Sequence, residues 1–141
     1  MLRSTRNWSR PLTTRRAACS CGQLHLAIEG EPIRISICHC FECQRRTGAV
    51  LSNQARFARE QITFAGTATE WTRTAASGNA LTFRFCPVCG STVYWTGEGF
   101  PGYVAVSIGA FISRAGDRAA SGCQPLPARR CGGGAPLTYQ R

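Results

Sequence analysis

The chain has 141 residues, of which 43% are hydrophobic and 9% aromatic, and this composition is typical of one globular domain. No apolar run approaches the roughly 18 to 20 residues that a membrane-spanning helix needs, which predicts no membrane partner. The net charge of +10 raises the question of nucleic-acid binding. Five arginines, however, lie in residues 1–16 and five in residues 112–141, whereas residues 17–111 carry seven arginines against six glutamates. The central part therefore predicts no specific nucleic-acid partner.

The same distribution divides the chain into three parts. Residues 1–16 are rich in arginine and threonine without an apolar period, which predicts a disordered basic N-terminal extension. Residues 17–112 form the predicted zinc-binding β domain, and residues 113–141, rich in glycine, proline and arginine, predict a divergent, disordered tail. All 17 basic residues are arginine, which excludes catalysis by a lysine nucleophile or Schiff base.

Short strands are predicted along the central part. Leu24, Leu26 and Ile28 alternate with polar residues, and the alternation resumes over residues 33–37 after a Gly-Glu-Pro turn. These two runs predict a hairpin of half-buried strands. Such strands between glycine- and proline-containing turns predict an all-β sandwich or barrel. A helical turn is expected at residues 41–46, and further strands at residues 49–57, 61–64, 68–73, 80–85, 91–96 and 103–108.

Seven of the nine cysteines lie in three tight clusters. Thiolates two or three residues apart can bind one metal ion, with Zn–S bonds of about 2.3 Å. A disulfide framework fits less well, because the number of cysteines is odd and the N-terminus lacks the apolar stretch of a secretory signal. The pattern therefore predicts a zinc protein in a reducing, cytoplasmic location. The clusters are Cys19 with Cys21, then Cys38, Cys40 and Cys43, and finally Cys86 with Cys89.

The count also predicts how many ions bind. A structural zinc site is closed by four thiolates, whereas a catalytic site keeps three protein ligands and an open position. The two outer pairs supply four thiolates for a structural ion, and the central triplet supplies three for a catalytic ion. Cys123 and Cys131 lie outside these clusters and are expected to be free, although either is a possible fourth ligand of the second zinc.

With these motifs in order, the chain resembles the glutathione-dependent formaldehyde-activating enzyme family, whose domain is shared with centromere protein V. The resemblance covers about residues 17–111 and implies an Mss4-like fold, a twisted β architecture with two zinc ions. It implies a structural site at the outer pairs and a catalytic site at the triplet. The segments that carry it are Ala18-Cys19-Ser20-Cys21-Gly22-Gln23, Cys38-His39-Cys40-Phe41-Glu42-Cys43-Gln44-Arg45-Arg46-Thr47-Gly48-Ala49 and Phe85-Cys86-Pro87-Val88-Cys89-Gly90-Ser91.

The implied activity is condensation of formaldehyde with glutathione to S-hydroxymethylglutathione, formally a carbon–sulfur lyase reaction in reverse. Its partners are a small-molecule thiol and an aldehyde. Arg45 and Arg46 follow the triplet and are candidates for binding an anionic thiol, while His39 is expected to be structural. A non-catalytic zinc module of the same fold, or an inactive member with a degenerate C-terminus, is the alternative. A methionine sulfoxide reductase is less consistent with the Cys-x-Cys-Gly opening.

Overall fold

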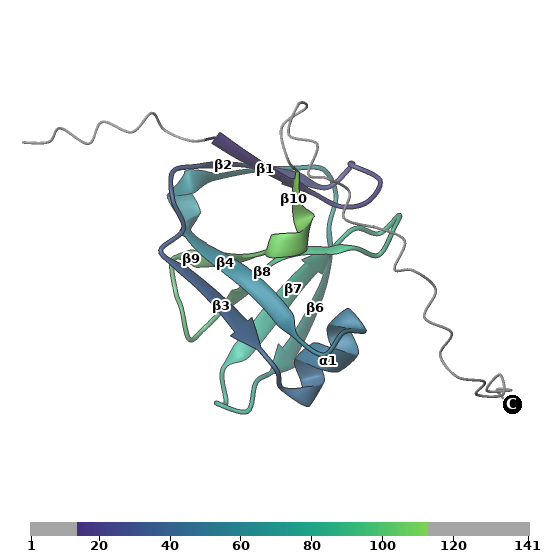
Figure 1. Ribbon diagram of the computed structural model, residues 1–141, viewed down its shortest axis with the longest axis vertical. Coiled ribbons are helices and arrows are strands. Elements are labelled where there is room, and N and C mark those ends of the chain that lie inside the picture. Colours follow the sequence, from purple (N-terminus) through teal and green to yellow (C-terminus); the bar gives the residue numbers. More distant parts are fainter. Residues whose placement is uncertain (1–13, 113–141) are drawn as a thin grey trace, which may run out of the picture.

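The computed structural model describes residues 14–112, which form two antiparallel sheets and one α-helix. The small sheet has the order β10-β1-β2-β5 and the large sheet the order β3-β4-β9-β8-β7-β6. In Figure 1 the small sheet lies at the top and α1 at the opposite end of the molecule. The elements are β1 (Thr14–Ala18), β2 (His25–Glu29), β3 (Arg34–Cys38), α1 (Phe41–Thr47), β4 (Ser52–Ala58), β5 (Ile62–Ala65), β6 (Thr69–Thr74), β7 (Ala80–Phe85), β8 (Thr92–Gly97), β9 (Tyr103–Ser107) and β10 (Phe111–Ile112), with 3-10 turns at Arg59–Gln61 and Ile108–Ala110.

The main core is a cluster of buried side chains contributed by both sheets. Leu26 and Ile28 of β2 are fully buried, as the alternation in the sequence predicts. They belong to one apolar cluster with Phe57 of β4 and Val104 and Val106 of β9. The prediction of an all-β fold is therefore confirmed. No helix among the described residues is long and apolar enough to cross a membrane.

The predicted hairpin between residues 24–28 and 33–37 is wrong. β2 pairs with β1 and β5 in the small sheet, whereas β3 pairs with β4 in the large sheet. The turn between them therefore carries the chain from one sheet to the other. β3 is an edge strand, and the two isoleucines within it and the one directly before it are 57 to 65% exposed, although they alternate as a buried face does. Those side chains are Ile33, Ile35 and Ile37.

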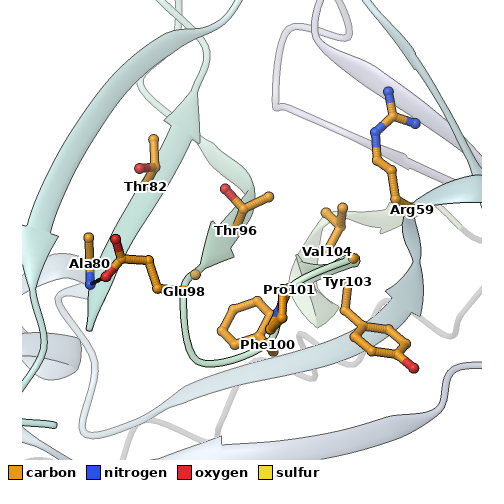
Figure 2. A pocket seen from close by; sticks show the side chains of 11 residues that line it. Arg59, Ala80, Thr82, Thr96, Glu98, Phe100, Pro101, Tyr103 and Val104 are labelled. Atoms are coloured by element: carbon orange, nitrogen blue, oxygen red, sulfur yellow. Dashed lines mark hydrogen bonds between the residues drawn. The ribbon is translucent and has the colours of Figure 1, made fainter. Parts of the chain in front are cut away.

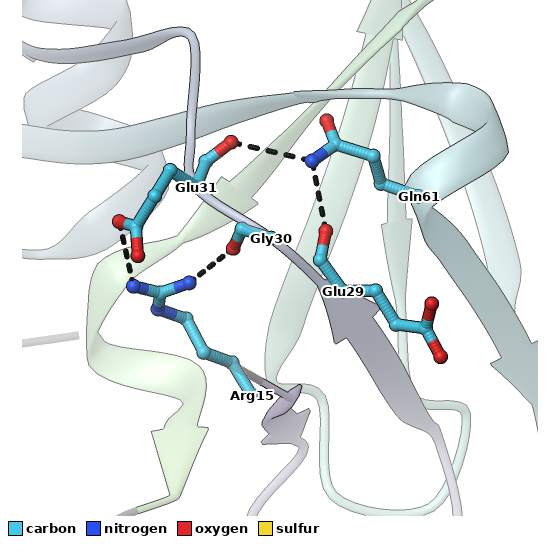
Figure 3. Close-up of polar contacts among 5 residues, drawn as sticks. All are labelled: Arg15, Glu29, Gly30, Glu31 and Gln61. Carbon is cyan, nitrogen blue, oxygen red and sulfur yellow. Dashed lines mark hydrogen bonds and ion pairs between the residues drawn. The ribbon is translucent and has the colours of Figure 1, made fainter. Parts of the chain in front are cut away.

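The first strand, β1, begins at Thr14, three residues before the domain start predicted at residue 17. Arginine-rich sequence is ordered here through long-range polar contacts. The Arg15 guanidinium donates to the Gly30 carbonyl and pairs with the Glu31 carboxylate at 2.8 Å (Figure 3). The Gln61 amide donates to the Glu29 carbonyl at 2.8 Å and fixes the same turn. Residues 1–13 and 113–141, including Cys123 and Cys131, lie outside the described part, so the predictions made for them stay predictions.

Candidate metal centres

The four-cysteine cluster consists of Cys19, Cys21, Cys86 and Cys89, and it joins two turns far apart in the sequence. Cys19 and Cys21 lie in the turn between β1 and β2, and Cys86 and Cys89 in the turn between β7 and β8. All four sulfur atoms lie within 4.8 Å of one another. The Cys19–Cys21 and Cys21–Cys86 Sγ distances are 3.5 and 3.6 Å. Thiolates at about 2.3 Å from one ion lie about 3.8 Å apart in a tetrahedron, so this donor set fits zinc.

Backbone and side-chain donors point at these sulfur atoms. The Leu24 N–H donates to Cys19 Sγ at 3.3 Å, and the Val88 N–H donates to Cys86 Sγ at 3.3 Å. The Gln23 side chain adds an amide donor at 3.0 Å from Cys86 Sγ. Such contacts stabilise negative charge on sulfur and orient metal ligands. Their presence is the second feature of this cluster that fits a thiolate-bound metal.

The two turns are also tied together by serines beside the cysteines. The hydroxyls of Ser20 and Ser91 lie 2.8 Å apart, and the Ser20 N–H donates to Ser91 Oγ at 3.2 Å. Hydrogen bonding with Ser91 lowers the pKa of Cys89 to about 5. This favours the thiolate form of Cys89, which is the form that binds metal. In the same cluster, hydrogen bonds with the other cysteines and desolvation outweigh a lowering backbone contact from Gln23 and raise the pKa of Cys21 to about 11.

The three-cysteine cluster consists of Cys38, Cys40 and Cys43. Cys38 ends β3, Cys40 precedes α1 as its N-cap, and Cys43 lies one turn into the helix. Their sulfur atoms also lie within 4.8 Å of one another. Within residues 14–112, no fourth His, Cys, Asp or Glu ligand joins them. Three ligands with Cys40 exposed match the donor set of an open zinc site.

Two arginines lie against this cluster. Arg46 of α1 is half-buried, donates to the Ser52 hydroxyl at 2.6 Å and stacks over Phe83 and Trp95. Arg73 of β6 lies 4.0 Å from Cys43 Sγ, measured from its guanidinium nitrogen. Burial, together with hydrogen bonds from the other two cysteines, raises the pKa of Cys43 to about 12. The arginines thus supply positive charge where three thiols must lose protons to bind a metal.

The other residues singled out from the sequence are placed differently. Arg45 points to solvent and pairs with Glu42 of the same helix at 3.0 Å. His39 is exposed, and its backbone carbonyl accepts a hydrogen bond from the Gln44 amide at 2.9 Å. Sequence reasoning missed Arg73 and Ser52, because both reach the cluster only through the folding of the large sheet and no local motif marks them.

Two cavities accompany the large sheet. One, of about 420 Å³, is lined by Arg46 together with Trp71 and Phe83, whose rings stack with centroids 5.8 Å apart. The other, of about 360 Å³, lies beside the turn after β8 (Figure 2). Its acidic residue, Glu98, already accepts from the Ala80 N–H at 2.7 Å. Of these two cavities, only the first is lined by Arg46, the arginine that lies against the three-cysteine cluster.

Two antiparallel sheets with two clusters of converging thiols define an all-β, cysteine-rich protein whose clusters could each hold a metal ion. The model of the glutathione-dependent formaldehyde-activating enzyme family matches residues 14–124, most of the chain, so the chain belongs to this family. The match begins before and ends beyond the predicted domain of residues 17–112, and it therefore includes part of the predicted tail.

Among solved structures, the fold is similar to that of a Rhodobacter sphaeroides protein determined by crystallography. The TM-score is 0.55 at 17% sequence identity, and the similarity covers 75% of this chain and 94% of that chain. No curated protein matches the chain significantly. At this identity the crystal structure supports the fold alone.

Proposed function

We propose that the protein is a zinc-dependent carbon–sulfur lyase-like enzyme, similar to S-(hydroxymethyl)glutathione synthase, which condenses formaldehyde with glutathione. The observation that carries the proposal is the three-cysteine cluster, with three converging thiols and no fourth ligand among the described residues. Family membership supports a small-molecule thiol and an aldehyde as the proposed substrates. In this proposal Cys38, Cys40 and Cys43 hold the catalytic zinc, and the four-cysteine cluster holds the structural zinc.

When bound, the catalytic zinc supplies a position at which a thiol loses its proton. The sulfur lone pair then forms the new C–S bond with the formaldehyde carbon, while the C=O π pair moves to the oxygen. That oxygen takes up a proton equivalent to the one the thiol released. Thiol and formaldehyde thus give a hydroxymethyl thioether with no other reactant.

The protein's own contribution is to orient an anionic thiol. Three thiolates leave a divalent ion with a net charge of −1, so a cationic wall favours binding of a second anion. Arg46 and Arg73 provide this wall beside Cys43. Arg45, which is exposed on α1, is proposed to bind a substrate carboxylate together with these two arginines. Its guanidinium would then contact both that carboxylate and Glu42. The seven cysteines within residues 14–112 form no disulfide, which supports the cytoplasmic location that we propose.

The test is the rate of S-hydroxymethylglutathione formation, followed by NMR with zinc-loaded protein and compared with the same buffer without protein. We expect acceleration by the wild type and none by Cys40→Ser. Thr63→Ser, at an exposed position of β5 in the small sheet and outside both clusters, is the control and keeps the wild-type rate. A wild-type protein with both metals that does not exceed the buffer rate contradicts the proposal and favours the non-catalytic zinc module.

A further inference from the structure

One face of the large sheet, which we call the site face, carries both the three-cysteine cluster and a set of arginines. Side chains two residues apart on a strand share a face, so Arg34, Ser36 and Cys38 of β3 lie on one side. Their partners in register on β4 are Arg56, Gln54 and Ser52. The same face continues through Trp95 and Phe83, against which Arg46 stacks.

Arg34 and Arg56 are direct cross-strand neighbours on this face. The Arg56 guanidinium stacks over the Phe100 ring at 4.1 Å, and its Nε atom is buried without a hydrogen-bond partner. Burial, and then the nearby charge of Arg34, lowers the pKa of Arg56. Two like charges are therefore held side by side, one of them with an unused donor.

No carboxylate offsets this pair within residues 14–112. The ion pairs there join Arg15 to Glu31, Arg45 to Glu42 and Arg84 to Glu70, and none involves Arg34 or Arg56. Between the pair and the cysteines, the Gln54 amide donates to Ser36 Oγ at 2.9 Å and leaves its own Oε1 buried without a donor. Two buried polar atoms without a hydrogen-bond partner, Arg56 Nε and Gln54 Oε1, thus lie along the strip that leads from the arginine pair to Cys38.

We propose that Arg34 and Arg56 form an anion subsite that binds a carboxylate of the thiol whose sulfur lies at the three-cysteine cluster. Arg34 and Cys38 are four residues apart on β3, which corresponds to roughly 13 Å between their Cα atoms. A tripeptide-sized thiol spans up to about 10 Å, and the long arginine side chains cover the remainder. This subsite deepens the proposed function, on which its thiol ligand rests.

The experiment compares Arg34→Gln with wild-type zinc-loaded protein by calorimetric titration with glutathione and with its diethyl ester, in which both carboxylates are masked. Arg34 has no side-chain hydrogen bond among the described residues, so its replacement leaves the fold intact. We expect Arg34→Gln to weaken glutathione binding about 5- to 10-fold, the size of a charge-assisted contact, and to leave ester binding unchanged. Arg16→Gln, the same charge change at an exposed position on β1, is the control and leaves both affinities unchanged.

A second arm titrates 15N-labelled protein with inorganic sulfate and follows the arginine Nε–Hε signals by NMR. We expect the Arg56 signal to shift, and the shift to disappear in Arg34→Gln. An Arg56 signal that does not respond to sulfate overturns the subsite, whatever the thiol does. An equal loss for glutathione and its ester overturns the carboxylate contact. If sulfate binds at Arg56 but glutathione binds to no variant, the anion subsite stands and the glutathione role of the proposed function fails.

Discussion

Gln23 connects the four-cysteine cluster to the small sheet through a single side-chain amide. Its Nε2 donates to Cys86 Sγ at 3.0 Å and to the Thr67 carbonyl at 2.7 Å, and its Oε1 accepts from the Thr67 N–H at 3.0 Å. Gly66 permits this approach, because a Cβ atom there would lie 1.8 Å from the Gln23 carbonyl oxygen and its φ is +89°. Gln23 thus orients the sulfur of Cys86, one of the candidate metal ligands, through a hydrogen bond.

Replacement of Gln23 by alanine should therefore weaken zinc binding at this cluster. Loss of a donor to a ligand atom costs about 10- to 100-fold in metal affinity. Competition with a chelator, followed as zinc release per chain, measures the effect. Gln44→Ala is the matched control, because its amide bonds the His39 carbonyl beside the other cluster. Equal zinc retention at the four-cysteine cluster in Gln23→Ala and wild type would contradict the role given to Gln23.

At the scale of the elements, β3 shows that an alternating apolar pattern does not ensure that the side chains are buried. Its isoleucines alternate with other residues as Leu26 and Ile28 of β2 do, yet Ile35 is 65% exposed, whereas Ile28 is fully buried. The small sheet covers the core face of the large sheet over β4 and β9, and the edge strand lies beyond that cover. Apolar side chains that stay exposed contribute little to the folding free energy, because that contribution follows the apolar area removed from water.

The same substitution at these two positions should change the free energy of unfolding by very different amounts. Ile35→Thr should change the free energy of unfolding by less than about 0.5 kcal/mol, as for an ordinary surface site. Ile28→Thr removes buried apolar atoms and buries a hydroxyl, and should cost about 2–4 kcal/mol. Urea denaturation of both zinc-loaded variants measures the difference. A similarly large loss at Ile35 would mean that its side chain is covered in solution.

The positions of several strands could be predicted from the sequence, because strand formation depends largely on neighbouring residues. The predicted strand at residues 80–85 matches β7 to the residue, and the helical turn at residues 41–46 matches α1 within one residue. Pairing is not local. Alternation at residues 24–28 and 33–37 fixes which side chains share a face, but it does not say which strand lies alongside, and the predicted hairpin failed there.

The candidate site divides in the same way. The cysteines could be grouped from spacings of two and three residues, since short turns bring such thiols together. Arg73 and Ser52 lie on separate strands and reach the three-cysteine cluster only through sheet pairing and the placement of α1. Arg45 pairs with Glu42 because the two residues lie three positions apart on the helix. The next residue, Arg46, points toward the large sheet and stacks over Phe83.

At the scale of the whole molecule, arginines that lie far apart in the sequence are brought together on one face. Residues 17–111 are nearly neutral in sum, yet Arg34, Arg46, Arg56 and Arg73 lie toward the site face without an ion-pair partner among the described residues. The arginines that do form ion pairs are Arg15, Arg45 and Arg84, and their partners are Glu31, Glu42 and Glu70. Summing charges along the chain therefore concealed a cationic surface beside the cysteines.

The two cysteine clusters also differ in what they do for the molecule. The four-cysteine cluster links the β1–β2 turn of the small sheet to the β7–β8 turn of the large sheet. A zinc ion there would contribute on the order of 10 kcal/mol, comparable to the whole net stability of a domain. The three-cysteine cluster joins only β3 to the adjoining α1, so the fold depends on it much less.

Zinc equivalents per chain, measured by elemental analysis together with circular dichroism, test this division most directly. Wild-type protein should contain two equivalents. Cys40→Ser should contain one equivalent and keep the wild-type β-sheet spectrum and cooperative unfolding. A wild-type protein with a single equivalent, or a Cys40→Ser protein that retains both ions or unfolds, would contradict one closed and one open thiolate centre.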